Sequence, residues 1–229
     1  MLKIILWKIG FEWTNIRRIF WPGSDKVYYF AFGANLSPDV LARRSISIFD
    51  TLDFALDGAT LKFSQSGFHK GHGYASADEA PGEVVYGRLY LMRKSDAERM
   101  DYFEGVPFMK VHQKIHQRQH DLDFYYYRAT SPQDGLRPTK EYLNYLVDAY
   151  REMPTVPDTY ITTLAETPVL EKLLPQDQTG TFIQHIEHWP RRLHPILIRY
   201  EATCLVIVKF LWHRSLFQWL IRNENAPNE

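Results

Sequence analysis

The amino-acid sequence predicts an α+β fold, and three stretches of the chain carry that prediction. Residues 27–32 are rich in Val, Tyr and Phe, which favour strands, and they lead to Gly33 and a helix start. A second run of strand-forming residues covers 84–92 and is followed by a helix pattern. Residues 139–153 place apolar side chains three and four residues apart, as in a helix with one buried face. The 229 residues suffice for one domain with appended segments.

Composition narrows the classes of function. Lys plus Arg and Asp plus Glu both number 27, so the formal charge is zero and nucleic-acid binding is disfavoured. Cys204 is the single cysteine, which rules out an intrachain disulfide and a cysteine zinc site and fits a reducing compartment. Charges interrupt the apolar N-terminus, so we expect no signal peptide, and no apolar run reaches the roughly 18 residues of a membrane span. We therefore expect a cytoplasmic protein, with membrane association of its ends as an alternative.

The N-terminal segment, 1–26, is expected to form an amphipathic helix ahead of the core domain. Its apolar residues recur at helical steps on one face: Leu2, Ile5, Ile9, Trp13, Ile16 and Phe20. Four basic residues lie mostly off that face: Lys3, Lys8, Arg17 and Arg18. The helix would either pack on the domain or lie as a cationic helix at a membrane surface.

The junction at Gly33 has the sequence of a strand, a tight turn and a helix start. Gly33 is expected to take a positive φ or to let another group approach its backbone closely. Ser37 is a candidate N-cap, and Pro38 and Asp39 suit a first helical turn. Free backbone N–H groups would then meet at one point, where an anion such as a carboxylate can bind.

The region between this junction and the second confident strand is expected to be less regular. Residues 47–63 alternate loosely and predict further strands. The glycine-rich stretch 67–82 predicts a loop that ends in a Pro81-Gly82 turn, with one short strand at 74–77 as an alternative within it. Gly87, inside the strand at 84–92, predicts a bulge or a close approach of another backbone.

The helix expected over 95–104 has signals at both ends. Ser95 and Glu98 have the spacing of a capping box, and Gly105 stands where a left-handed residue would end the helix.

Glu104 lies on the inward face of this helix, in its last turn. Burial and the negative end of the helix dipole would both raise the pKa of its carboxyl, which suits a general acid/base at neutral pH. The alternative is that Glu104 pairs with an arginine or caps a loop.

Two paired strands are expected next, at 111–120 and 124–128. His112, His116 and His120 recur every four residues, but in a strand they spread too far apart for one ion, so a metal site is disfavoured. Thr139 is a candidate cap of the helix at 139–153. Asp158 is expected to cap a further helix, with Tyr160 on its inward face as a core residue.

The C-terminal segment, 167–229, is expected to be irregular at first and then to form an aromatic-rich helix over 201–221. Five of the six tryptophans lie in the two terminal segments: Trp7, Trp13, Trp21, Trp212 and Trp219. The two ends would pack on each other, form a homodimer interface, or contact a membrane peripherally.

Three blocks of the chain carry a family resemblance. They are Tyr29–Leu36, then 81–87 leading through the following helix to Glu104-Gly105-Val106-Pro107, and finally Tyr142–Leu164. In this order they resemble the γ-glutamylcyclotransferase family, also described as the AIG2-like fold, over about residues 27–166. The resemblance implies a small mixed β-barrel with surrounding helices and a pocket at its end. The amphipathic terminal helices lie outside it.

The resemblance also implies an enzyme of the lyase or acyltransferase type, acting on a small γ-glutamyl substrate. The α-amine of the substrate attacks its own side-chain carbonyl, forms 5-oxoproline and releases an amine or amino acid, as in glutathione metabolism. Glu104 would be the catalytic general acid/base. The implied substrate-binding residues are Tyr29, Phe32, Gly33, Ala34, Asn35 and Tyr160. No metal or cofactor is implied.

Phe32 and Ala34 depart from the family pattern, which has tyrosine and serine at these positions. The two missing hydroxyls favour an alternative, a non-catalytic γ-glutamyl-binding or scaffold module that its termini recruit to a membrane or a partner. Glu104 and Gly33, which match the pattern, favour the enzyme.

Overall fold

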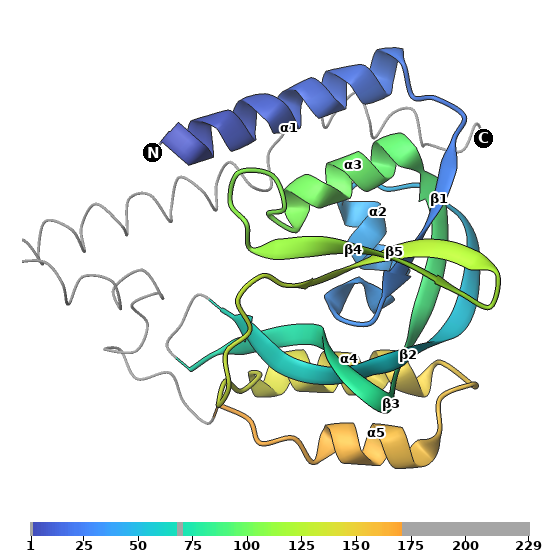
Figure 1. Cartoon of the computed structure of the whole chain (residues 1–229), viewed down its shortest axis with the longest axis vertical. Helices are drawn as coiled ribbons and strands as arrows, with labels where there is room; N and C mark the ends of the chain where they lie inside the picture. Colours follow the sequence, from blue (N-terminus) through green and yellow to red (C-terminus); the bar gives the residue numbers. More distant parts are fainter. Residues whose placement is uncertain (1, 68–70, 171–229) are drawn as a thin grey trace, which may run out of the picture.

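The computed structural model describes residues 2–67 and 71–170. Its elements occur in the following order: α1 (Leu2–Phe20), β1 (Lys26–Ala31), the 3-10 helix η1 (Ala34–Leu36), α2 (Pro38–Arg43), β2 (Ile48–Ser66), β3 (Gly73–Arg93), α3 (Lys94–Phe103), β4 (His112–Gln119), β5 (Leu122–Ala129), α4 (Lys140–Arg151) and α5 (Asp158–Ala165). Figure 1 shows α1 and α3 at one end of the sheet, with α4 and α5 at the opposite end. The expected α+β class is confirmed.

The five strands form one mixed sheet in the order β2-β3-β1-β5-β4. Strand β1 is central: it runs antiparallel to β3 and parallel to β5. The strand order is open rather than a closed barrel, but the two outer strands meet through one side chain. Gln119 at the end of β4 accepts from the Asp57 N–H of β2 at 3.1 Å and donates to the Ala55 carbonyl at 2.8 Å. The sheet therefore curls far enough for its edges to touch.

The expected loop over 67–82 is wrong in extent. Strand β3 begins at Gly73 and pairs with β2 from there, so the connection between the two strands is short. The Pro81-Gly82 turn does not reverse the chain. Pairing passes from Ala59 with Glu79 to Asp57 with Val84, and Gly58 and Gly82 take φ values of +75° and +86° at this irregularity. A left-handed glycine on each strand lets the hairpin bend and continue.

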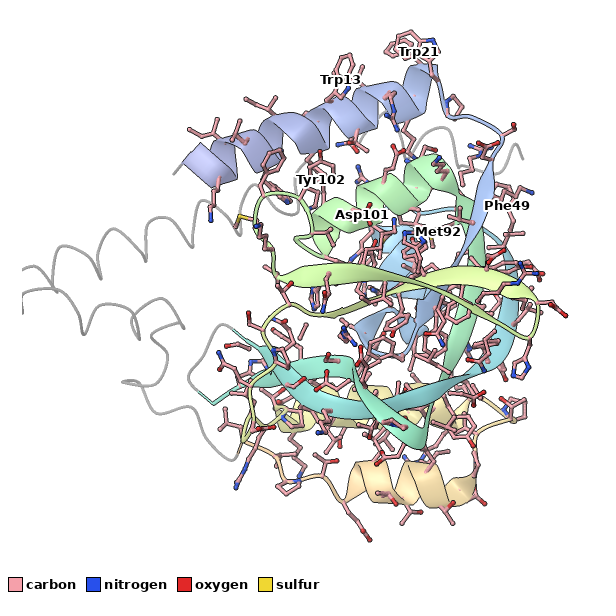
Figure 2. The ribbon with its side chains drawn as sticks, viewed as in Figure 1. Trp13, Trp21, Phe49, Met92, Asp101 and Tyr102 are labelled. Carbon is pink, nitrogen blue, oxygen red and sulfur yellow. The ribbon has the colours of Figure 1, made fainter. Side chains whose placement is uncertain are left out.

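Helix α1 packs on α3. Trp7 and Phe11 are buried and contact the aromatic end of α3, and the Trp7 indole N–H donates to the Tyr102 carbonyl at 2.9 Å. Figure 2 shows Trp13 and Trp21 pointing away from the domain. Among the residues that the structure describes, no helix is long and apolar enough to cross a membrane.

The local signals for helix ends have mixed outcomes. Gly105 ends α3 with φ +64°, and the Thr139 hydroxyl accepts from the Tyr142 N–H, as expected. The capping box is wrong, because α3 begins at Lys94, so Ser95 lies inside the helix and is buried, and Glu98 pairs instead with Arg17 of α1. The residue that flanks α5 at its start is Pro157 rather than Asp158.

Gly87 makes the close approach that the sequence predicts. A Cβ on Gly87 would come within 2.3 Å of the Ala31 carbonyl oxygen, so β3 and β1 touch there. The helix expected over 201–221 and the irregular segment from 171 onward lie outside the described residues.

Candidate active site

Three side chains from separate parts of the chain contact the carboxylate of Glu104. The Arg44 Nη1 lies 2.6 Å from Glu104 Oε1, and Asn35 of η1 donates to the same oxygen at 3.1 Å. His112 at the start of β4 places Nδ1 at 3.5 Å from Oε2. Asn35 also donates to the Tyr29 hydroxyl of β1 at 2.7 Å, which extends the group into the sheet.

The backbone around Glu104 explains this convergence. Glu104 is the residue directly after α3, and the left-handed Gly105 reverses the chain, so that the Val111 N–H donates to the Gly105 carbonyl. His112 therefore returns beside Glu104. Its Nδ1 lies 2.8 Å from the Glu104 carbonyl oxygen, which can only accept, so this nitrogen carries the proton.

The last turn of α3 is also tied to the sheet. Asp101 accepts from the Tyr127 hydroxyl of β5 at 2.6 Å and lies 3.0 Å from the Lys114 ammonium of β4. These contacts hold the end of α3 against the strands and so position Glu104, three residues further along the chain.

The structure corrects the expected direction of the Glu104 pKa. Burial alone would raise the pKa of this carboxyl, but the positive charge of Arg44, assisted by His112 and by hydrogen bonds from Arg44 and Asn35, lowers the pKa below its usual value. The expected rise followed from burial and the helix dipole alone, whereas the alternative expectation, that Glu104 pairs with an arginine, is confirmed by its contact with Arg44. Glu104 is therefore ionised at neutral pH in this state.

Tyr29 and Asn35 form the buried side of the group. Burial, with the nearby charge of Glu104, raises the pKa of Tyr29, so its hydroxyl stays protonated. Asn35 is 7% exposed, and its amide nitrogen donates hydrogen bonds to the Tyr29 hydroxyl and to Glu104. Its Oδ1 is buried and has no hydrogen-bond partner within the described part of the chain.

The loop from Phe32 to Leu36 is held by tyrosines of α4 through its backbone carbonyls. Tyr145 donates to the Ala34 carbonyl at 2.6 Å, and Tyr150 donates to the Phe32 carbonyl at 2.8 Å. Gly33 differs from expectation, since its φ is −112°, and a Cβ there would meet its nearest neighbours only at 3.4 and 3.5 Å. Neither a positive φ nor a close backbone contact explains this glycine.

Two of the residues implied by the resemblance lie elsewhere. The Phe32 ring packs in the opposite cluster with Phe30 and Tyr126, because successive residues of a strand point to opposite faces. Tyr160 packs instead against the rings of Tyr86 and Tyr150. Of the implied set, the structure brings together Glu104, Tyr29 and Asn35.

Sequence reasoning missed Arg44 and the contact of His112 with Glu104. Nothing local distinguishes Arg44 from Arg43, and only the tertiary fold places one of them beside a residue 60 positions away. His112 was considered only for metal binding. Within residues 2–67 and 71–170, no group of three or more His, Cys, Asp or Glu could hold a metal ion.

Neither of two hollows in the surface is lined by Glu104 or by the side chains that contact it. One, of about 420 Å³, is bordered by α5 and Arg151, and another, of about 370 Å³, lies over β1, β4 and β5 beside His116 and Tyr28. The group itself reaches solvent through Arg44, whose side chain is 23% exposed, against 13% for Glu104.

Comparison with known proteins finds solved structures of similar fold. Residues 84–164 match the AIG2-like family. A solved structure named gamma-glutamyl cyclotransferase is similar with a TM-score of 0.55 and 22% identity, covering 71% of this chain and 98% of that one. The structure of an uncharacterized protein from Homo sapiens is similar with a TM-score of 0.54 and 22% identity, covering 71% of this chain and 98% of that one. The structure of YkqA from Bacillus subtilis is similar with a TM-score of 0.54 and 15% identity, covering 68% of this chain and 60% of that one.

No curated protein sequence matches the chain. The fold class and the resemblance to the γ-glutamylcyclotransferase or AIG2-like family are confirmed by the family match and the similar structures.

Proposed function

We propose that this chain, which has a γ-glutamylcyclotransferase-like fold, cyclises small γ-glutamyl compounds to 5-oxoproline and releases an amine or amino acid. The observation that carries the proposal is the position of Glu104: a largely buried carboxylate at the end of α3, in contact with Asn35 of the loop that follows β1. These are the two places that match the motifs of the family.

The reaction needs one proton carrier and good positioning. The α-amine nitrogen of the substrate attacks the γ-carbonyl carbon, the bond from that carbon to the leaving nitrogen breaks, and one proton passes from the first nitrogen to the second. Glu104, ionised in the free protein, would accept this proton from the amine and return it to the leaving group. Because both reacting groups belong to one molecule, holding them in place supplies much of the acceleration.

Backbone N–H groups near Gly33 would hold the developing oxyanion. Two tyrosines of α4, Tyr145 and Tyr150, hold the backbone of this loop by hydrogen bonds to its carbonyls. Rigid donors of this kind lose little energy to reorganisation during the reaction.

The departure at Phe32 favours a non-catalytic binding module less than the sequence suggests. The Phe32 ring lies in a cluster away from Glu104, so a hydroxyl added to it would not join the group around that carboxylate.

The test is the release of 5-oxoproline from γ-glutamyl amino acids, γ-glutamyl-lysine and glutathione, with Glu104→Gln beside the native protein. We expect the substitution to lower kcat by at least about 100-fold, the usual contribution of a general acid/base. Glu141→Gln is the matched control, because Glu141 is exposed on α4, and it should keep full activity. Full turnover by Glu104→Gln would reject the role of Glu104. No release by the native protein would favour the binding module.

A further inference from the structure

We propose that Arg44 binds the α-carboxylate of the substrate, so that the site selects compounds with an intact α-amino-acid head group. This inference rests on the proposed function and assigns a substrate-binding role to a residue that neither the sequence motifs nor the fold comparison single out.

Arg44 has unused hydrogen-bonding capacity at the right place. A guanidinium carries five N–H donors in a planar fork. Within the described residues, its side chain makes one hydrogen bond to oxygen, from Nη1 to Glu104, and one weak contact with the sulfur of Met100 at 3.9 Å. The donors on Nε and Nη2 are thus left for a second carboxylate, and the partial exposure of the side chain lets a ligand reach them.

The guanidinium is held in place rather than free to swing. Its Cζ lies 5.0 Å from the centre of the Phe103 ring, and the backbone carbonyl of Arg44 accepts from the buried Arg99 Nε at 2.8 Å. A fixed fork loses less conformational entropy when it binds a carboxylate than a mobile side chain does.

Asn35 supplies a complementary acceptor. Its buried Oδ1 lacks a partner in the structure as described, although buried polar atoms are normally hydrogen-bonded. An α-ammonium or α-amine can donate to this oxygen. Arg44 and Asn35 both contact Glu104 Oε1, so donors for a carboxylate and an acceptor for an amine flank the same carboxylate.

This arrangement matches the chemistry of a γ-glutamyl compound. Its α-amine and α-carboxylate are attached to one carbon, so an amine placed within reach of Glu104 brings the carboxylate close to the neighbouring cation. When Arg44 divides its charge between two carboxylates, it stabilises ionised Glu104 less. The pKa of Glu104 would then rise on binding, which makes it a better proton acceptor.

The test compares two compounds that differ only in the α-carboxylate: γ-glutamyl-alanine and 4-aminobutanoyl-alanine. Both would cyclise with release of alanine, which is measured for each. We expect the native protein to prefer γ-glutamyl-alanine in kcat/KM, and Arg44→Gln to reduce this preference by about 10- to 100-fold, the worth of hydrogen bonds to a charged group. Arg44→Lys should restore part of it. Arg43→Gln, an exposed neighbour, should leave it unchanged.

The result that would overturn the inference is an equal loss for both compounds in Arg44→Gln, because Arg44 would then act only by keeping Glu104 ionised. Calorimetric titration of γ-glutamyl-alanine into Glu104→Gln, with and without Arg44→Gln, separates this inference from the proposed function. If the native protein shows no turnover but binding to Glu104→Gln requires Arg44, the result supports the inference and rejects the reaction. Neither turnover nor binding would reject both.

Discussion

At the scale of single residues, the neighbouring cation Arg44 keeps the carboxyl of Glu104 ionised. The groups that face its carboxylate are Arg44 from the end of α2, His112 from β4, and Asn35 and Tyr29 from the β1 side. Arg44, His112 and Asn35 together lower the pKa of Glu104. The folded protein therefore holds this proton less tightly than the unfolded chain does, and ionised Glu104 contributes to stability.

This lowered pKa predicts a pH-dependent stability difference between the native protein and Glu104→Gln. The difference should be present above the usual pKa of glutamate and should disappear as the pH falls through the lowered value, because the carboxylate is then protonated in both states. At neutral pH we expect it to be about 1 to 3 kcal/mol, the worth of hydrogen bonds to a charged group.

Urea unfolding of both proteins between about pH 3 and pH 7 measures this difference. A difference that does not change with pH would show that Glu104 has an unperturbed pKa.

At the scale of elements, α1 is joined to α3 by a buried polar contact as well as by aromatic rings. Arg18 lies 2.5 Å from Asp96, and both side chains are almost fully buried. Burial raises the pKa of Asp96 even though Arg18 opposes this shift, so the carboxylate depends on its partner. Arg17, one residue earlier, pairs with Glu98 at the surface.

Two substitutions on α1 should therefore differ in their effect. Arg18→Met would leave Asp96 buried without its cation, and we expect it to lower the free energy of unfolding by about 3 kcal/mol. Arg17→Met removes only a surface pair and should cost less than about 1 kcal/mol. Urea unfolding of the two variants measures these losses of unfolding free energy. Equal losses would mean that the buried pair contributes no more than the exposed one.

The outer face of α1 is apolar. Exposed large side chains lie along it and just beyond its end: Ile5, Leu6, Ile9, Trp13, Phe20 and Trp21. The basic residues Lys8, Arg17 and Arg18 are all engaged in ion pairs with carboxylates of this chain. Peripheral membrane contact and a homodimer interface through the terminal segments remain predictions, as do the domain limits 1–26, 27–166 and 167–229.

At the scale of the whole molecule, the curled sheet depends on the contact between its two edges. Gln119 of β4 makes three hydrogen bonds with β2: two with the Asp57 backbone N–H and side chain, and one with the Ala55 carbonyl. Gln119→Ala should lower the free energy of unfolding by about 1 to 3 kcal/mol, at about 1 kcal/mol for each hydrogen bond.

Hydrogen exchange reports this contact directly, because the Asp57 amide loses its acceptor in Gln119→Ala and should exchange faster. Gln117→Ala, on the same strand, should leave that amide unchanged, since no hydrogen bond joins the Gln117 side chain to β2. Unchanged protection of Asp57 in Gln119→Ala would mean that backbone contacts alone hold the edges together.

Short-range patterns were sufficient for most of the elements. The strand at 27–32, the helix end at Gly105 and the cap at Thr139 depend on residues within a few positions of one another, and each occurs in the structure. The motif blocks also identified Glu104, Tyr29 and Asn35, which meet in space. Their roles in substrate binding and catalysis, and those of Phe32, Gly33, Ala34 and Tyr160, remain predictions.

Only the tertiary structure decided the features that depend on distant residues. From Gly73 onward the loop expected over 67–82 is part of β3, because it pairs with β2, and the glycine content of the stretch does not reveal this pairing. Arg44, directly after α2, lies beside Glu104, and Arg99 of α3 donates to its backbone carbonyl. The contact of Arg44 with Glu104 reverses the expected direction of the Glu104 pKa. Local sequence specifies backbone conformation over one or two turns, whereas electrostatic energy depends on distances that only the folded chain determines.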